Sequence, residues 1–218
     1  MMKFGLVSAI FPEDTFEAVF DYAAGVGFEG VEVCCWPKGK AERRYAGITH
    51  IDLDMLDSDK EKYYLDYAKK SGVGISSLGY YPNPLSADKA EAEVAVTHIK
   101  KLIEASARMG IGMVTTFIGR DPVKTVEENL DLMEKIWEPI VKLAEAKEVL
   151  IGIENCPMLF TKDEWPGGKN LMAAPYLWRQ VFERLPSKNL GLNYDPSHLL
   201  LTGSDHVLPV YNFAEKIF

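Results

Sequence analysis

The sequence predicts an α/β fold built as a (β/α)8 barrel, of which about six βα units and the start of a seventh are present. Three observations support this prediction. Short apolar runs alternate with longer helical patterns, no Gly-x-Gly-x-x-Gly follows the first run, and polar residues gather directly after several of the runs. Alternating strands and helices predict a parallel sheet, and polar residues that follow several of its strands are typical of the mouth of a barrel.

Six apolar runs are the predicted strands. Most consist of Val, Ile, Leu and aromatic residues, as expected for strands that are covered on both faces. They span residues 3–8, 28–34, 74–80, 112–118, 149–155 and 189–195. Residues 215–218 have the pattern of a seventh strand beginning. We therefore expect residues 1–218 to form a single barrel domain that stops before strands seven and eight.

Helical patterns lie between the apolar runs. The clearest of them are amphipathic or rich in Ala, Glu, Lys and Leu, which are good helix formers. They span residues 15–24, 88–109 and 125–147. Asp14 and Ser86 precede two of these segments, and both residue types are favoured as helix N-caps. We expect them to cap the two helices.

The composition excludes several classes of protein. The chain has 218 residues, 47% of them hydrophobic, with 24 Lys and Arg against 32 Asp and Glu for a net charge of −8. This acidic balance argues against a nucleic-acid or anionic-membrane partner. No run approaches the roughly 20 apolar residues of a membrane span. Three cysteines cannot form an even disulfide framework, so we expect a cytoplasmic protein without a signal peptide.

The strongest chemical signal lies at the ends of two consecutive predicted strands. Glu154 ends one run, Asp195 ends the next, and His198 follows three residues later. A buried carboxylate must be paired, protonated or bound to a metal, because an isolated buried charge is costly. Two carboxylates and an imidazole suit a divalent ion such as Mn²⁺, Mg²⁺ or Zn²⁺. Our expectation is Mn²⁺, with Mg²⁺, Co²⁺ or Zn²⁺ as alternatives. These residues alone leave open the alternative that both carboxylates cap loops or pair with basic residues.

Three short segments carry a resemblance to a known family. Residues 30–32 (Gly-Val-Glu), 153–155 (Ile-Glu-Asn) and 195–198 (Asp-Pro-Ser-His) resemble the xylose-isomerase-like TIM-barrel family, and the similarity covers essentially the whole chain. That family holds sugar isomerases, sugar-phosphate isomerases and epimerases, as well as the endonuclease-IV type of DNA repair enzyme. The resemblance implies an enzyme that isomerises or epimerises a small-molecule sugar or sugar phosphate.

The resemblance also implies roles for individual residues. Glu154 would be both a metal ligand and an acid/base catalyst, Asp195 the second metal ligand, and His198 a substrate-binding residue that contacts a hydroxyl. The ion would stabilise the enediolate that forms when a proton leaves the carbon beside a carbonyl. The family's remaining ligands, a histidine on strand seven and a glutamate on strand eight, have no counterpart within residues 1–218. We expect Asn155 to contact substrate. Asn155-Cys156-Pro157 stands where ketose epimerases have Pro-x-Asn, so the identity of the sugar is not carried over.

Other residues are candidates for substrate binding, each with a structural alternative. Glu32 ends the second predicted strand and can bind substrate or form a salt bridge at the barrel mouth. Arg120 follows the fourth strand and can meet a phosphate or hydroxyl, with Asp121 as a local alternative partner. Trp165 can form an apolar wall against a sugar or pack in the core. It lies in the long segment 158–174, which can be a lid or an inert surface excursion.

The three cysteines favour a structural interpretation. Cys34 and Cys35 are adjacent, and no Cys-x-x-Cys pattern is present. We expect both, and Cys156 as well, to be small buried hydrophobic residues and not redox or ligand groups.

Two other functions remain alternatives at this point. An endonuclease-IV-like nuclease needs many histidines and a DNA-binding face, and the chain has four histidines and a charge of −8. A non-catalytic barrel fragment that binds a small molecule or a partner is the second alternative. Its open sheet edges would allow a homo-oligomer.

Overall fold

The structure is a computed structural model of the chain, and it describes residues 3–39, 45–158 and 168–218. Two compact units make up the chain. Unit 1 comprises Met1–Tyr80 and Lys101–Val114, and unit 2 comprises Tyr81–Lys100 and Thr115–Phe218. The division falls inside helix α3 (Lys89–Arg108) and strand β4 (Met113–Thr116), so both elements contribute to each unit. The expectation of a single domain over residues 1–218 stays a prediction.

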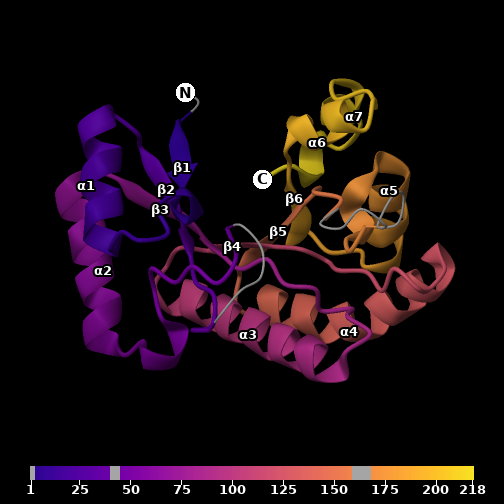
Figure 1. Cartoon of the computed structure of the whole chain (residues 1–218), viewed down its shortest axis with the longest axis horizontal. Coiled ribbons are helices and arrows are strands. Elements are labelled where there is room, and N and C mark those ends of the chain that lie inside the picture. Colours follow the sequence, from indigo (N-terminus) through magenta and orange to yellow (C-terminus); the bar gives the residue numbers. More distant parts are fainter. Residues whose placement is uncertain (1–2, 40–44, 159–167) are drawn as a thin grey trace. The chain divides into compact units, whose positions relative to one another are not determined.

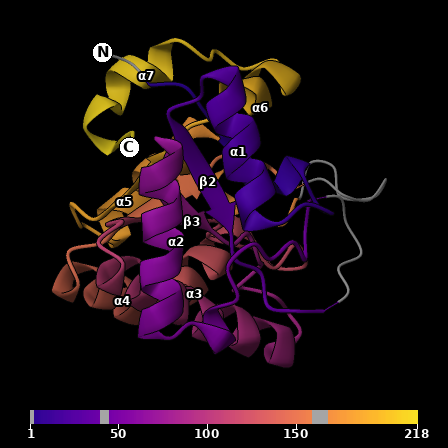
Figure 2. The same cartoon turned by 90° about the vertical axis from the view of Figure 1, so that its left-hand side faces the viewer.

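Unit 1 is built on three parallel strands that follow the order of the sequence. Helices α1 and α2 connect these strands and lie side by side over them (Figures 1 and 2). The elements are β1 (Gly5–Val7), α1 (Phe16–Val26), β2 (Gly30–Cys34), α2 (Ser58–Ser71) and β3 (Gly74–Gly79). Strand β2 is almost wholly buried, which agrees with the near-continuous apolar run in its sequence.

Unit 2 repeats the strand–helix alternation. Strands β5 and β6 are parallel, and Gly152 lies opposite Gly191 in their register. The elements that follow β4 are α4 (Val126–Ala146), β5 (Leu150–Glu154), α5 (Pro175–Arg184), β6 (Leu190–Asn193), α6 (Pro196–Leu201) and α7 (Leu208–Asn212). Each of the six strands lies within one of the six predicted runs. The α/β class is therefore confirmed.

Two helix caps differ from the prediction by one or two residues. Helix α1 is capped by Thr15, whose hydroxyl accepts a hydrogen bond from the Ala18 N–H at 3.3 Å, and not by Asp14. At α3, the Asp88 carboxylate accepts from two N–H groups of the first turn, where Ser86 was expected. The physical reason is the same in both cases. A capping oxygen must belong to the residue directly before the helix to reach these N–H groups.

The start of a seventh strand is confirmed at the end of unit 2. Ile217 forms a parallel bridge with Leu192 of β6, and the Phe218 N–H donates to the Leu192 carbonyl at 3.0 Å. A Cβ atom on Gly191 would overlap the Lys216 carbonyl oxygen and the Phe218 ring. Glycine at this position is what lets the last residues lie against β6.

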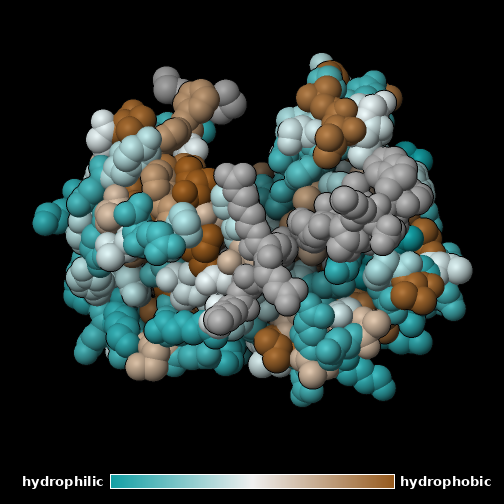
Figure 3. All heavy atoms as spheres, in the orientation of Figure 1, coloured by the Kyte–Doolittle hydropathy of each residue, from teal (hydrophilic) through white to brown (hydrophobic). Residues whose placement is uncertain are grey.

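Helices α6 and α7 expose a hydrophobic surface. Figure 3 shows hydrophobic residues over these two helices. The exposed side chains on and between them are Leu200, Leu201, Val207, Leu208, Val210 and Tyr211. Such a surface is available for self-association, and the homo-oligomer stays a prediction.

Candidate functional site

The candidate site lies in unit 2, where β5 and β6 end. Glu154 is the last residue of β5, and it lies opposite Asn193 of β6 in the parallel register. The rest of β5 is largely buried, whereas the Glu154 side chain remains 22% exposed. Asp195 follows β6 by two residues and caps α6, because its Oδ1 accepts from the Ser197 N–H at 2.8 Å. The two parallel strands therefore bring both carboxylates to the same end of the sheet.

A histidine lies between the two carboxylates. His198 Nε2 is 3.1 Å from Glu154 Oε1 and 3.4 Å from Asp195 Oδ2. The side chains of His198 and Asp195 are 20% and 40% exposed, so solvent reaches this group of residues. The short helix α6, which begins directly after Asp195, turns His198 back toward the strand ends. The convergence expected from the sequence is thus present.

The charge state of the imidazole follows from its neighbours. Hydrogen bonds with Cys156 and with Glu154 raise the pKa of His198 to about 10, and the Asp195 charge adds to the effect, while burial opposes it. His198 is therefore a cation at neutral pH. Its positive charge offsets the negative charge of the carboxylates at the strand ends.

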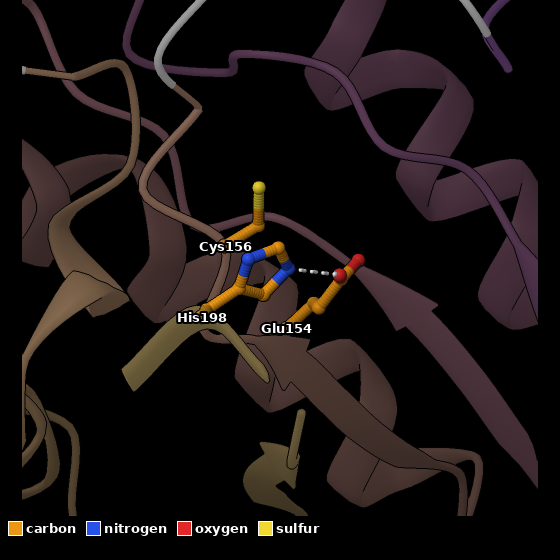
Figure 4. A group of neighbouring side chains, drawn as sticks. All are labelled: Glu154, Cys156 and His198. Atoms are coloured by element: carbon orange, nitrogen blue, oxygen red, sulfur yellow. Dashed lines mark hydrogen bonds and ion pairs between the residues drawn. The ribbon is translucent and has the colours of Figure 1, made fainter. Parts of the chain in front are cut away.

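Cys156 is the site residue that the sequence analysis missed. It is half-buried, and its Sγ lies within 4.8 Å of the ligand atoms of Glu154 and His198. Figure 4 shows the Cys156 and Glu154 side chains beside the His198 imidazole. The Met158 N–H donates a hydrogen bond to Sγ at 3.4 Å. The expectation that Cys156 is a small buried hydrophobic residue is wrong, because β5 has ended by this position and the side chain projects from the following loop into the site.

Asn155 fixes the spacing of the two strand ends. Its side chain is fully buried, with Nδ2 donating to the Asp195 carbonyl at 2.8 Å and Oδ1 accepting from the Asp195 N–H at 2.6 Å. Both hydrogen-bonding ends of the amide are thus used on the backbone of one residue. Asn155 positions Asp195 beside Glu154, and its expected contact with substrate stays a prediction.

A second buried asparagine holds the loop that follows β5. Asn170 is 1% exposed, and its Nδ2 donates to the carbonyls of Glu154 at 2.9 Å and Cys156 at 2.7 Å. It thereby fixes the backbone on both sides of Asn155. A partner 14 to 16 residues away leaves no local sequence signal, so this contact is visible only in the structure.

A comparison with known families identifies the fold to which these residues belong. The model of a family described as "Xylose isomerase-like TIM barrel" matches residues 20–218. The chain belongs to this family. The resemblance stated from residues 30–32, 153–155 and 195–198 is confirmed.

Individual relatives of this xylose isomerase-like chain are distant. An uncharacterized protein from Methanocaldococcus jannaschii is 24% identical over 99% of the chain, and the chain spans 66% of that relative's length. Among solved structures, a probable 3-DHS dehydratase from Bacillus anthracis has a TM-score of 0.75 at 17% identity, covering 99% of this chain and 71% of that one. D-Psicose 3-epimerase from Clostridium cellulolyticum H10 has a TM-score of 0.74 at 14% identity, with the same coverages. These structural likenesses establish the fold.

The remaining predicted site residues have separate environments. Glu32 lies in unit 1, where it is 8% exposed and accepts a hydrogen bond from Ser77 Oγ at 3.3 Å. Arg120 lies in unit 2, where its backbone N–H and carbonyl both bond the Asn83 side chain, at 2.9 and 2.8 Å. Trp165 lies outside the described residues. The substrate-binding roles of Glu32, Arg120 and Trp165 stay predictions.

Asp121, the local alternative partner suggested for Arg120, has contacts with the residues that follow it. Its carboxylate is almost fully buried, accepts from the Val123 N–H at 3.1 Å and pairs with Lys124 at 3.0 Å. These contacts shape the turn before α4.

The donor atoms of the site fit a divalent transition-metal ion. Within residues 3–39, 45–158 and 168–218, Glu154, Cys156 and His198 are the one group of three such side chains whose ligand atoms all lie within 4.8 Å of one another. Carboxylate, imidazole and thiol are each established ligands of such ions, whereas Mg²⁺ prefers oxygen alone. Asp195 adds a second carboxylate beside the group. The donor set is therefore compatible with a metal ion. Which ion the site prefers depends on which of these side chains bind it.

None of the helices in the described ranges combines the length and apolar character that a membrane-spanning segment requires.

Proposed function

We propose that the protein is a divalent-metal-dependent isomerase or epimerase that acts on a sugar or sugar phosphate through an enediolate. The observation that carries this proposal is the partly exposed Glu154 carboxylate, which ends a buried barrel strand and has His198 at 3.1 Å and Asp195 beside it. Membership of the xylose isomerase-like family supports the reaction class. The names of the solved relatives, which include D-psicose 3-epimerase and L-ribulose 3-epimerase, support it further.

In this proposal the carboxylates of Glu154 and Asp195 hold the ion. When bound, a divalent ion supplies Lewis-acid polarisation of a carbonyl oxygen. Glu154 also accepts the proton from the carbon next to the carbonyl, since a general base must lie within hydrogen-bond reach of its proton. Its neighbour His198, charged at neutral pH, donates a hydrogen bond to a substrate hydroxyl.

The backbone contacts of the site favour this division of roles. Asn155 and Asn170 fix the backbone of Asp195, Glu154 and Cys156 by buried hydrogen bonds. Catalytic groups held in this way need no reorganisation when substrate arrives, which lowers the entropic part of the barrier. Delivery of the proton to the neighbouring carbon of the enediolate gives isomerisation, whereas delivery to the opposite face of the original carbon gives epimerisation and needs a second acid.

The test measures proton exchange, because this half-reaction needs one base only. The protein is incubated in D2O with Mn²⁺, Co²⁺ or Zn²⁺ and a panel of ketoses and ketose phosphates, and deuterium at the carbon beside the carbonyl is followed by NMR. We expect exchange with at least one sugar, loss of exchange with a chelator, and a fall of about 10³-fold in Glu154→Gln.

The matched control is Glu138→Gln on the exposed side of α4, where the carboxylate forms an ion pair with Lys142 one helical turn away. This variant should exchange at the unaltered rate. Exchange that survives in Glu154→Gln would overturn the proposal. Binding of a sugar without any exchange would favour the non-catalytic alternative.

A further inference from the structure

The chemistry of Cys156 is not used by the proposed mechanism. Its sulfur is one of three ligand-type atoms that lie within 4.8 Å of one another, together with one atom each from Glu154 and His198. The other two cysteines are different. Cys34 and Cys35 are 1% and 0% exposed and lie in the core of unit 1, whereas Cys156 is half-buried at the strand end.

The ligand-type atoms of the group lie within 4.8 Å of one another, which is close to the spacing in a small coordination sphere. In a tetrahedral zinc site, neighbouring ligand atoms are roughly 3.3 to 3.8 Å apart, since zinc binds sulfur at about 2.3 Å and nitrogen or oxygen at about 2.0 to 2.2 Å. Glu154 Oε1 forms an ion pair with His198 Nε2 at 3.1 Å, and the Cys156 sulfur lies within 4.8 Å of a ligand atom of each of these residues.

The backbone that carries Cys156 is held in place. Asn170 Nδ2 donates to the Cys156 carbonyl at 2.7 Å, and the Met158 N–H donates to Sγ at 3.4 Å. The sulfur is thus presented to the site by fixed backbone on both sides.

We propose that Cys156 is a ligand of the same ion as Glu154, and that its thiolate makes the site select Zn²⁺ over Mn²⁺. This inference rests on the metal site of the proposed function and specifies its cation. Thiolate is a soft ligand that suits zinc, whereas a site of carboxylates alone suits manganese or magnesium. Without the thiol, the remaining donors include the Glu154 and Asp195 carboxylates, hard oxygen ligands for which the preference for Zn²⁺ over Mn²⁺ is smaller.

The experiment uses metal chlorides alone, with no sugar. The affinities of Zn²⁺ and Mn²⁺ are measured by calorimetry for the unaltered protein, Cys156→Ser and Glu154→Gln, and Co²⁺ is added as a spectroscopic probe. We expect a thiolate-to-cobalt charge-transfer band in the near ultraviolet that is lost in Cys156→Ser. The preference for Zn²⁺ over Mn²⁺ should fall by about 10- to 100-fold in that variant. Cys34 and Cys35 are present in all of these proteins, so the lost band reports Cys156.

A second measurement needs no substitution. Zn²⁺ at saturation should protect Cys156 from alkylation by iodoacetamide, as identified by mass spectrometry of the labelled peptide, and Mn²⁺ should protect it less. This arm keeps the inference testable if Cys156→Ser fails to fold.

The outcomes separate the two proposals. If Mn²⁺ and Zn²⁺ bind through Glu154, but the cobalt band is absent and the metal preference is unchanged in Cys156→Ser, the inference about Cys156 is overturned and the metal site of the proposed function stands. If no metal binds the unaltered protein, both are overturned. A Glu154-dependent metal site with a Cys156-dependent cobalt band supports both.

Discussion

Two strands of this protein carry a glutamate and a cysteine two residues apart at their carboxyl ends, but the two pairs lie in different environments. Strand β2 has Glu32 and Cys34, and strand β5 has Glu154 with Cys156 two residues later. In unit 1 the strand continues through Cys34, and both side chains are buried, with Glu32 8% and Cys34 1% exposed. In unit 2 the strand stops at the glutamate, and both side chains stay half-buried around His198.

The difference lies in what surrounds each strand end. Ser8 accepts a hydrogen bond from the Cys34 N–H at 2.8 Å, and Ala9, Ile48 and Trp36 pack around the Cys34 side chain. Burial of this kind raises the pKa of the Cys34 thiol to about 12. The same spacing of glutamate and cysteine is therefore a core element in one unit and a candidate site in the other. The position at which the strand ends determines whether the glutamate and cysteine are buried in the core or form part of a candidate site.

The largest expected effect is on thiol reactivity. In the native protein, iodoacetamide should label Cys156 roughly a thousandfold faster than Cys34 or Cys35, because burial raises the pKa of both core thiols and excludes the reagent. Peptide mapping after a timed reaction measures the three rates. In denaturant all three thiols should react alike, and labelling of Cys34 as fast as Cys156 in the native state would break the comparison.

The next effect is on stability at the β5–β6 end. Asn155→Ala removes two hydrogen bonds to Asp195 from a fully buried position, so we expect a loss of about 2–4 kcal/mol in urea unfolding. The matched control is Asn189→Ala at the opposite end of the same strand pair, where one side-chain bond to the Val149 carbonyl is lost. That variant should cost about 1 kcal/mol. Equal losses of stability in the two variants would mean that the two hydrogen bonds of Asn155 contribute no more than the single bond of Asn189.

The smallest expected effect is the difference in stability between variants of the two glutamates, Glu32 and Glu154. Glu32→Ala leaves the buried Ser77 hydroxyl without its carboxylate partner, so it should cost about 1–3 kcal/mol of stability. Glu154→Ala should cost less than about 1 kcal/mol, because water can reach and replace this partly exposed carboxylate. Urea unfolding of both variants gives the two values. A larger loss of stability in Glu154→Ala than in Glu32→Ala would show that Glu154 contributes mainly to the stability of the fold and not to a functional site.

The sequence predicts the fold better than it predicts the site. Buried parallel strands leave a strong local signal, and all six fall inside the predicted apolar runs. The convergence of Glu154, Asp195 and His198 also follows from strand order, since the ends of neighbouring parallel strands lie together. Cys156 was missed because a residue just beyond a strand can point into the site or into the core, and the residue types do not distinguish these cases.

Contacts between distant segments account for the rest. Asn170 bonds the backbone 14 to 16 residues earlier, and Asn83 bonds the backbone of Arg120 across 37 residues. Such amide-to-backbone bonds depend on the finished fold, because they pair a side chain with carbonyl and N–H groups that every residue possesses. The pattern of residue types in the sequence therefore does not predict these bonds.

Gly191 offers a way to detach one segment without disturbing its neighbours. A methyl group there would occupy the space of the Lys216 backbone and the Phe218 ring, while the pairing of residue 191 with Gly152 on the other side of β6 uses the main chain only. Alanine at this position would therefore act as a steric wedge that frees Ile217 from Leu192 and leaves β5 and β6 paired. A fluorophore near the carboxyl terminus would report the release.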